Sequence, residues 1–435
     1  MTSSYSDAPR LRELIERANA RVGAELASDL DHLEARLTRA GASAGKIVAA
    51  LREFSVAAPS WAVGTGGTRF GRFPIGGEPR TTEEKIDDIA VLNAFTAANR
   101  TVSLHVPWDL PDDPAALKEH AAARGIGFDA MNSNTFQDNA ATTRGGRLSY
   151  KFGSFASADP AVREAAVEHN LQVVDLGVKL GSKAITIWLA DGTSYPGQAD
   201  HRTQFERTAG ALRAVHDHLP DDWRMFTEHK PYEPAFYATV NADWGSSLLL
   251  AQAAGPRCAC LVDLGHHLPN TNIEQVVSRL AMTGRLGGFH FNDARYGDDD
   301  LTTGSVKPFQ LFLVSCELLT AGGGELPELA LMIDQSHNLK DPLEDLMQAT
   351  EAIAIAYAQA MLVDREALRA AQDEDDPALC QELLQAAFRT DVRPLVAEAR
   401  RLGGGAIDPL LAYRESGYRQ AMIAERGAEA VATGL

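Results

Sequence analysis

Side chains that can bind metals or transfer protons stand at the ends of four apolar runs in the second half of the chain. They are Glu228 and Lys230 in the run 224–231, Asp263 and His266 in 258–267, His290 in 286–293, and Asp334 in 329–336. A mixture of carboxylates and imidazoles suits a divalent ion such as Mn²⁺, Co²⁺ or Mg²⁺ better than it suits a structural zinc site. The pattern therefore predicts a metal centre where these runs leave the core.

The loop after the third of these runs adds three consecutive acids in the segment YGDDDL. Asp298 and Asp300 are two residues apart, so both carboxylates can converge on one ion. Carboxylates packed this closely repel one another unless cations or protons lie between them. The available ligands suffice for two ions that share one carboxylate. We expect Asp263 to be the shared ligand, because it lies on a central strand beside His266.

Each of these residues also has an ordinary structural interpretation. A lone acid at the end of a strand is usually a helix cap or a turn residue, and an acidic loop is usually solvated. Four consecutive strand ends with acids and imidazoles favour the metal centre, because caps need not alternate in that way. We expect the neighbouring His229, His267, Asp293 and Asp299 to be bystanders.

Aromatic residues and one more histidine stand at the ends of earlier runs. Trp61, Trp108 and Trp188 suit stacking on the apolar face of a sugar, and core packing explains each of them about as well. His105 either faces the same pocket or is a buried, hydrogen-bonded histidine. No GxSxG or Cys–His pattern indicates covalent catalysis.

Eight apolar runs, most of them separated by segments of helical period, are the elements that must position these side chains. They span residues 60–67, 101–108, 125–134, 183–192, 224–231, 258–267, 286–293 and 329–336. Continuous apolar strands that alternate with helices imply a parallel sheet covered on both faces. Eight such units predict an α/β fold of the (β/α)8 TIM-barrel type, whose active site lies at the C-terminal ends of the strands. A doubly wound open sheet is the structural alternative.

Helical segments flank the predicted barrel. A capped apolar pattern from Leu11 to Leu37 predicts an N-terminal helix, and the pattern beyond Asp341 is helical to the end. We expect residues 1–345 to form the barrel with its N-terminal helical segment. Residues 346–435 are expected to form a helical C-terminal extension that packs on the barrel and on a neighbouring subunit.

The composition excludes some classes of partner. The 435 residues include 41 Lys and Arg against 59 Asp and Glu, and this net charge of −18 argues against a nucleic-acid partner. No apolar signal segment opens the chain and no run of eighteen apolar residues occurs, so no membrane association is expected. The four cysteines form no zinc-like pair, and we expect reduced thiols in a cytoplasmic protein.

Seven segments together resemble the bacterial L-rhamnose isomerases of broad aldose specificity, which belong with the xylose isomerase-like barrels. The segments are PSWAVGTGGTRF, VSLHVPWD, FDAMNSNTF, TEHKPYEPAFY, LVDLGHHLPNTNIE, GGFHFNDARYGDDDL and MIDQSHN. They span about residues 58–342, and the helical tail is similar as well. The set is specific, although any one segment alone would not be.

The resemblance implies a homotetrameric enzyme with two divalent metal ions per subunit, preferably Mn²⁺, that converts L-rhamnose to L-rhamnulose. One ion would be held by Glu228, Asp263, His290 and Asp334, and the other by Asp263, His266, Asp298 and Asp300. Each position matches its motif. His290 stands where the xylose isomerases have a carboxylate.

Further roles accompany the resemblance. Lys230 would hydrogen-bond the C1 oxygen of an open-chain sugar, Asp298 or a water molecule would take the O2 proton, and His105 would bind the ring oxygen or the C5 hydroxyl. Substrate contacts are expected from Trp61, Phe136, Trp188 and Asp334, with Phe70 reaching in from a neighbouring subunit.

Two routes can move the hydrogen from C2 to C1 of the aldose. A hydride shift needs a base only for the O2 proton, whereas an enediol route needs a side-chain base near both carbons. The visible groups are ligands and no dedicated carbon base stands out, which favours the hydride shift.

Two other classes of function compete with the isomerase. A metal-dependent phosphoesterase on the same barrel also gathers acids and imidazoles at its strand ends. A non-catalytic sugar-binding protein is the third class, but it would not need seven metal ligands and a buried lysine.

Overall fold

The computed structural model describes residues 8–64, 73, 75–138, 148–335 and 339–429. Its central feature is a parallel barrel. The barrel strands are β1 (Ala58–Pro59), β2 (Thr101–Ser103), β3 (His105–Val106), β4 (Gly127–Phe128), β5 (Met131–Ser133), β6 (Ala184–Trp188), β8 (Arg224–Glu228), β10 (Cys258–Asp263), β11 (Leu286–Phe291) and β12 (Ala330–Ile333). β2 with β3, and β4 with β5, each occupy one barrel position, so eight positions result.

The barrel is closed between its first and last positions. One sheet has the order β12-β11-β10-β8-β6-β5-β3, and a second has the order β1-β2-β4. The Ala57 N–H donates to the Leu331 carbonyl at 2.8 Å, and the Ile333 N–H donates to the Ala57 carbonyl at 3.0 Å. These bonds join β1 to β12, so the predicted TIM barrel is confirmed and the open sheet is excluded.

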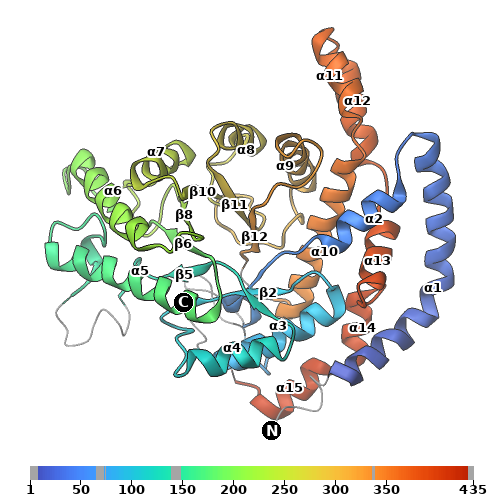
Figure 1. The fold of residues 1–435 in the computed structure, drawn as a ribbon, viewed down its shortest axis with the longest axis horizontal. Helices are drawn as coiled ribbons and strands as arrows, with labels where there is room; N and C mark the ends of the chain where they lie inside the picture. Colours follow the sequence, from blue (N-terminus) through green and yellow to red (C-terminus); the bar gives the residue numbers. More distant parts are fainter. Residues whose placement is uncertain (1–7, 65–72, 74, 139–147, 336–338, 430–435) are drawn as a thin grey trace.

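Eight helices surround the barrel (Figure 1). They are α3 (Thr82–Thr96), α4 (Pro114–Ala122), α5 (Pro160–Leu180), α6 (His201–His218), α7 (Trp244–Ala254), α8 (Ile273–Met282), α9 (Pro308–Ala321) and α10 (Pro342–Met361). Three of them, α4, α5 and α10, begin with an Asp cap followed by proline. The carboxylate accepts bonds from otherwise unpaired N–H groups, and proline needs no partner at this position.

The first predicted strand is wrong in its position. Residues 60–67 were expected to be extended, but β1 ends at Pro59 and Ser60–Val63 form the 3-10 helix η1. Proline lacks the N–H that would extend the ladder, so the strand ends there. The second and third predicted strands are each interrupted, at Leu104 and at residues 129–130.

Additional helices lie on one side of the barrel (Figure 1). They are α1 (Ala8–Arg39), α2 (Ala44–Glu53), α11 (Arg365–Asp373), α12 (Pro377–Phe388), α13 (Arg393–Leu402), α14 (Pro409–Ser416) and α15 (Tyr418–Arg426). The predicted domain boundary after residue 345 falls inside α10, and this division stays a prediction. Within the described ranges, no single helix is long and apolar enough to cross a membrane, although α10 and α11 reach that length and composition together as a bent pair.

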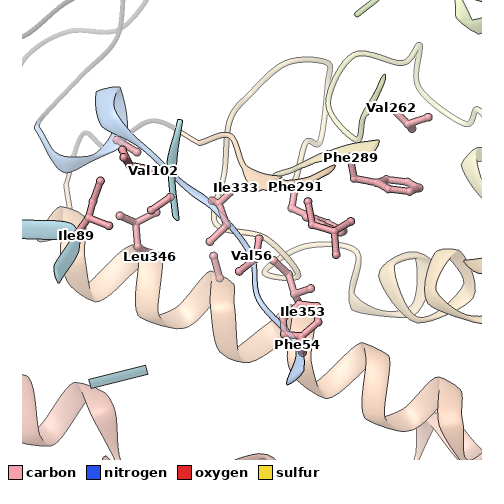
Figure 2. Close-up of a cluster of buried hydrophobic side chains, with 14 of the residues drawn as sticks. Phe54, Val56, Ile89, Val102, Val262, Phe289, Phe291, Ile333, Leu346 and Ile353 are labelled. Atoms are coloured by element: carbon pink, nitrogen blue, oxygen red, sulfur yellow. The ribbon is translucent and has the colours of Figure 1, made fainter. Parts of the chain in front are cut away.

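A continuous hydrophobic core fills the space between the barrel and α10. Figure 2 shows Val56, which precedes β1, and Ile333 of β12 beside α10, whose Leu346 and Ile353 belong to the same cluster. Each such buried side chain stabilises the folded chain by about 1.5–3 kcal/mol. The seam that closes the barrel is therefore supported by α10.

Candidate metal centre and active site

Four predicted ligands from four strand positions converge at the C-terminal end of the barrel. They are Glu228 of β8, Asp263 of β10, His290 of β11, and Asp334 directly after β12, and one ligand atom from each lies within 4.8 Å of the others. His290 Nδ1 is 3.0 Å from Glu228 Oε1 and 3.3 Å from Asp334 Oδ2. Parallel strands bring these residues together, because their C-terminal ends meet on one face of the barrel.

A second group shares Asp263 with the first. Asp263, His266 and Asp298 also place ligand atoms within 4.8 Å of one another, and all three are buried. His266 Nε2 is 3.0 Å from Asp298 Oδ1. Asp298 has a positive φ of 52°, a conformation that aspartate tolerates better than most residues. Asp300, also predicted as a ligand, is half-buried and lies outside both groups in the described part of the chain.

The charges of the two groups fit divalent cations. Burial raises the pKa of Asp263 to about 7, and the nearby carboxylates of Glu228 and Asp334 add to this effect while His266 and His290 oppose it. Burial alone would lower the pKa of His290, but Glu228 and Asp334 raise it to about 10. Positive charge between the buried carboxylates would relieve their mutual repulsion. A divalent ion bound by carboxylate oxygens and imidazole nitrogens supplies such charge.

Asn292 supports the shared ligand Asp263, a role that the sequence analysis did not assign to it. Its Nδ2 donates to both carboxylate oxygens of Asp263, at 3.0 and 3.1 Å. The backbone N–H groups of Gly265 and His266 donate to Asp263 Oδ1 at 2.7 and 3.1 Å. These bonds fix the orientation of the shared carboxylate. The one sequence signal is spacing, since Asn292 stands two residues after His290 and so shares its face of the strand.

Lys230 is buried beside the second group. Its ammonium pairs with Asp298 and lies 3.0 Å from Glu233 Oε2, a residue that sequence reasoning missed. The same ammonium lies 4.8 Å from the ring centroid of Trp188, within the range of a cation–π contact. The Lys230 ammonium is therefore held between the carboxylates of Asp298 and Glu233 and the ring of Trp188.

Aromatic rings surround His105 and form what we call the aromatic wall. The ring centroids of Trp61, Trp108 and Phe136 lie 5.3, 4.8 and 5.8 Å from that of His105. Phe136 also contacts Trp188 at 4.2 Å. Burial lowers the pKa of His105 to about 4, so its imidazole is neutral near pH 7. This wall offers apolar faces together with one neutral polar group.

Trp61 links the aromatic wall to the first metal-ligand group. Its Nε1–H donates to Asp334 Oδ1 at 2.9 Å. Phe70, the predicted contact from a neighbouring subunit, lies outside the described residues.

Two of the expected bystanders have clear structural tasks. Asp293 accepts bonds from the backbone N–H groups of Val306 and Lys307 at 2.7 and 2.8 Å, just before α9. Asp299 accepts from the N–H of Tyr296 at 2.8 Å and so shapes the acidic loop. His229 and His267 pack edge to face, with centroids 4.8 Å apart. Neither Asp293 nor Asp299 belongs to the two metal-ligand groups described above.

The chain is closely similar to two proteins named as probable sugar isomerases. One from Mesorhizobium japonicum is 53% identical over 418 residues, which cover 96% of each protein. One from Rhizobium meliloti is 51% identical over 421 residues, again 96% of each. A xylose isomerase from Thermus thermophilus is 26% identical over 289 residues, 61% of this chain and 69% of that enzyme. No protein-family model matches the chain.

Solved structures of sugar-converting barrels share the fold. An L-ribulose 3-epimerase superposes with a TM-score of 0.51 at 16% identity, covering 71% of this chain and 95% of the other. A xylose isomerase domain protein from Alicyclobacillus acidocaldarius also gives 0.51 at 15% identity, covering 71% and 99%. The chain thus shares the barrel fold of these proteins. By its identity with the two rhizobial proteins, the chain belongs to the family of probable sugar isomerases.

Proposed function

We propose that the protein is an aldose–ketose isomerase that converts L-rhamnose to L-rhamnulose and acts on related aldoses. The observation that carries this proposal is the convergence of two acid–imidazole groups that share Asp263. The family membership supports the class of reaction, and the segments that resemble L-rhamnose isomerases support the choice of sugar. The same resemblance supports a homotetramer, and the unpaired cysteines support a cytoplasmic protein.

Each group would hold one divalent ion, with Mn²⁺ as our first choice and Co²⁺ or Mg²⁺ as alternatives. Glu228, Asp263, His290 and Asp334 would hold the first, and Asp263, His266 and Asp298, with Asp300, the second. When bound, such ions polarise a carbonyl oxygen and lower the pKa of a neighbouring hydroxyl.

The remaining side chains would bind and orient the open-chain sugar. Lys230 donates to the C1 oxygen and stabilises the negative charge that develops there. Asp298, which lies beside Lys230, accepts the O2 proton. Hydrogen then moves with its electron pair from C2 to C1, O1 gains a proton, and C2 becomes the ketone.

The aromatic wall would set the orientation of the sugar. Neutral His105 hydrogen-bonds the ring oxygen or the C5 hydroxyl, and Trp61, Phe136 and Trp188 cover the apolar carbon edge. The hydrogen bond from Trp61 to Asp334 would fix the position of these rings relative to the first metal-ligand group.

Incubation of chelated and Mn²⁺-reconstituted protein with an aldose panel, followed by a ketose assay, tests the proposal. The panel contains L-rhamnose, L-lyxose, L-mannose and D-allose. We expect ketose formation only with the metal and the highest kcat/KM with L-rhamnose. Full activity after thorough chelation, or no ketose from any aldose, would contradict the proposal.

The rival function is a metal-dependent phosphoesterase, which the same ligand types permit. Phosphate release from model esters under the same conditions would favour it. The hydride shift has a separate test, since exchange of the transferred hydrogen with D2O, followed by NMR, would favour the enediol route.

A further inference from the structure

The last helix of the C-terminal extension buries charged side chains against two loops of the barrel. Arg419 and Arg426 of α15 are 8% and 7% exposed, although each carries a full positive charge. Burying an arginine is costly unless its donors are paired. The partners of these two residues therefore indicate what the extension does.

Arg419 joins two loops at once. Its Nε and Nη2 donate to the two carboxylate oxygens of Asp341 at 2.8 and 2.9 Å, which is a bidentate pair. Its Nη1 donates to the carbonyl oxygens of Gly76 and Gly77 at 3.3 and 3.1 Å. Asp341 is the cap of α10 and ends the β12–α10 loop, whereas Gly76 and Gly77 belong to the β1–α3 loop.

The two glycines fit closely against α15. Gly76 and Gly77 have φ of +80° and +69°. A Cβ atom added to Gly77 would lie 2.8 Å from the backbone nitrogen of Ile423 and 2.9 Å from the carbonyl carbon of Met422. The Gly77 N–H also donates to the Gly427 carbonyl at 2.8 Å. Backbone packs on backbone here, so a side chain at Gly77 would separate the loop from the helix.

Arg426 also binds Gly77 to α15, and it adds a contact with α3. Its Nη1 donates to Asp88 Oδ1 of α3 at 2.8 Å and to the Gly77 carbonyl at 3.3 Å. The Tyr418 hydroxyl donates to the same Asp88 oxygen at 2.6 Å. The helix α15 is thus tied to α3 as well as to the two loops.

The two loops lead from the strands that close the barrel and carry residues of the candidate site. The β1–α3 connection begins with η1 and Trp61, and the β12–α10 connection begins with Asp334. Trp61 Nε1–H donates to Asp334 Oδ1, so the two connections already meet at the site. The backbone hydrogen bonds of Ala57 join β1 to β12, the two strands from which these connections leave.

We propose that Arg419 is a positioning residue that holds Gly76 and Gly77, before α3, together with Asp341, at the start of α10, so that Trp61 and Asp334 keep their geometry at the active site. The C-terminal extension is then part of the catalytic framework. This inference rests on the proposed function for its kinetic consequence, but its structural consequence is independent of that function.

The test compares Arg419→Met with Arg414→Met in the full-length protein. Arg414 is the control, because it also makes a bidentate bond from the extension to α10, through Glu344, and it has no hydrogen bond to the described residues of either loop. We expect Arg419→Met to raise hydrogen–deuterium exchange in peptides covering 75–81 and 339–343. We expect kcat to fall about 10- to 100-fold, since small misplacements of substrate-positioning groups cost this much. Arg414→Met should leave both readouts unchanged.

A second pair of variants covers the case in which Arg419→Met fails to fold. Gly77→Ala should push the loop away from α15. Gly404 also has a positive φ, but a Cβ added there has no atom within 4 Å, so Gly404→Ala is the control. Gly77→Ala should reproduce the exchange increase in both segments and the loss of kcat, and Gly404→Ala should not.

Unchanged exchange in both segments for Arg419→Met or Gly77→Ala would overturn the inference, as would an equal kcat loss in either control. If the wild-type protein converts no aldose, the proposed function fails, and the exchange comparison still decides whether Arg419 holds the two loops.

Discussion

Asp263 is the residue on which both candidate metal sites depend. Its carboxylate belongs to both ligand groups, and three donors fix its orientation. Asp263→Ala should therefore abolish metal binding and turnover together. Lys230→Met should retain the metal and lower kcat about 10²- to 10³-fold, because it removes one donor to a developing charge. Measuring the metal content by mass spectrometry together with kcat distinguishes the metal ligand Asp263 from the hydrogen-bond donor Lys230. Loss of metal in Lys230→Met would contradict the role assigned to Lys230.

Asn292 should act through Asp263. Asn292→Ala removes the donor to both carboxylate oxygens, and loss of such a supporting bond typically costs about 10- to 100-fold in metal affinity. Asp293→Asn is the control, because Asp293 accepts bonds from the backbone N–H groups of Val306 and Lys307 just before α9 and should affect stability without changing metal affinity. Titration with Mn²⁺ followed by calorimetry measures the difference. Equal affinities in wild type and Asn292→Ala would refute this role.

The sequence reveals the ligand candidates because their types are rare at successive strand ends. Glu228, Asp263, His290 and Asp334 carry that signal. Asn292 and Glu233 do not, because amide and carboxylate side chains next to a strand usually serve turns. Their tasks depend on three-dimensional contacts with Asp263 and Lys230, which no spacing along the chain specifies.

Most elements follow from periodicity, and the exceptions have local causes. The strands β6, β8, β10 and β11 lie within predicted runs, because they are apolar, continuous and covered on both faces. The first strand was misplaced because the apolar residues of Ser60–Val63 form η1 after Pro59. Apolar character alone does not distinguish a buried turn of helix from a short buried strand.

The Asp341–Arg419 pair gives the last helix a pH-dependent attachment. Burial alone would raise the pKa of Asp341, but the Arg419 guanidinium and the Tyr413 hydroxyl hold it below its usual value of 3.8. A carboxyl whose pKa is lowered by folding stabilises the protein fully above its unfolded pKa, and this contribution is lost as the pH falls through the lower folded value.

Arg419→Met should therefore destabilise the protein by about 3–5 kcal/mol at neutral pH, because it leaves the largely buried carboxylate of Asp341 without its cationic partner. Without Arg419, burial raises the pKa of Asp341 above 3.8, so the stability gap between wild type and variant should begin to narrow above pH 3.8 and should go on narrowing as the pH falls toward the lowered pKa of wild type. Urea unfolding at a series of pH values measures it. Arg414→Met, which removes the pair of an exposed arginine, should lower the stability far less. A gap that does not depend on pH would contradict the assignment.

At the scale of the whole molecule, the barrel is predictable and the placement of the extension is not. Alternation of eight apolar runs with helices specifies the barrel. The apolar faces of α13, α14 and α15 predict only that these helices are covered. Their positions depend on contacts such as Arg426 with Asp88, which join residues 338 positions apart.

Metal binding should stabilise the entire fold. An ion that binds only the folded state at about 100 times its Kd adds about 2.7 kcal/mol per site to the free energy of unfolding. Mn²⁺ added to chelated wild-type protein should therefore raise the melting temperature, while Asp263→Ala should show no shift. Scanning calorimetry measures both, and an equal shift in the two proteins would place the binding elsewhere.

Diffraction at the manganese absorption edge, from crystals of the protein reconstituted with Mn²⁺, tests the central claim most directly. We predict two anomalous peaks per subunit. One should lie among Glu228, Asp263, His290 and Asp334, and the other among Asp263, His266 and Asp298. Crystals that contain manganese but show no peak among these side chains would contradict the account.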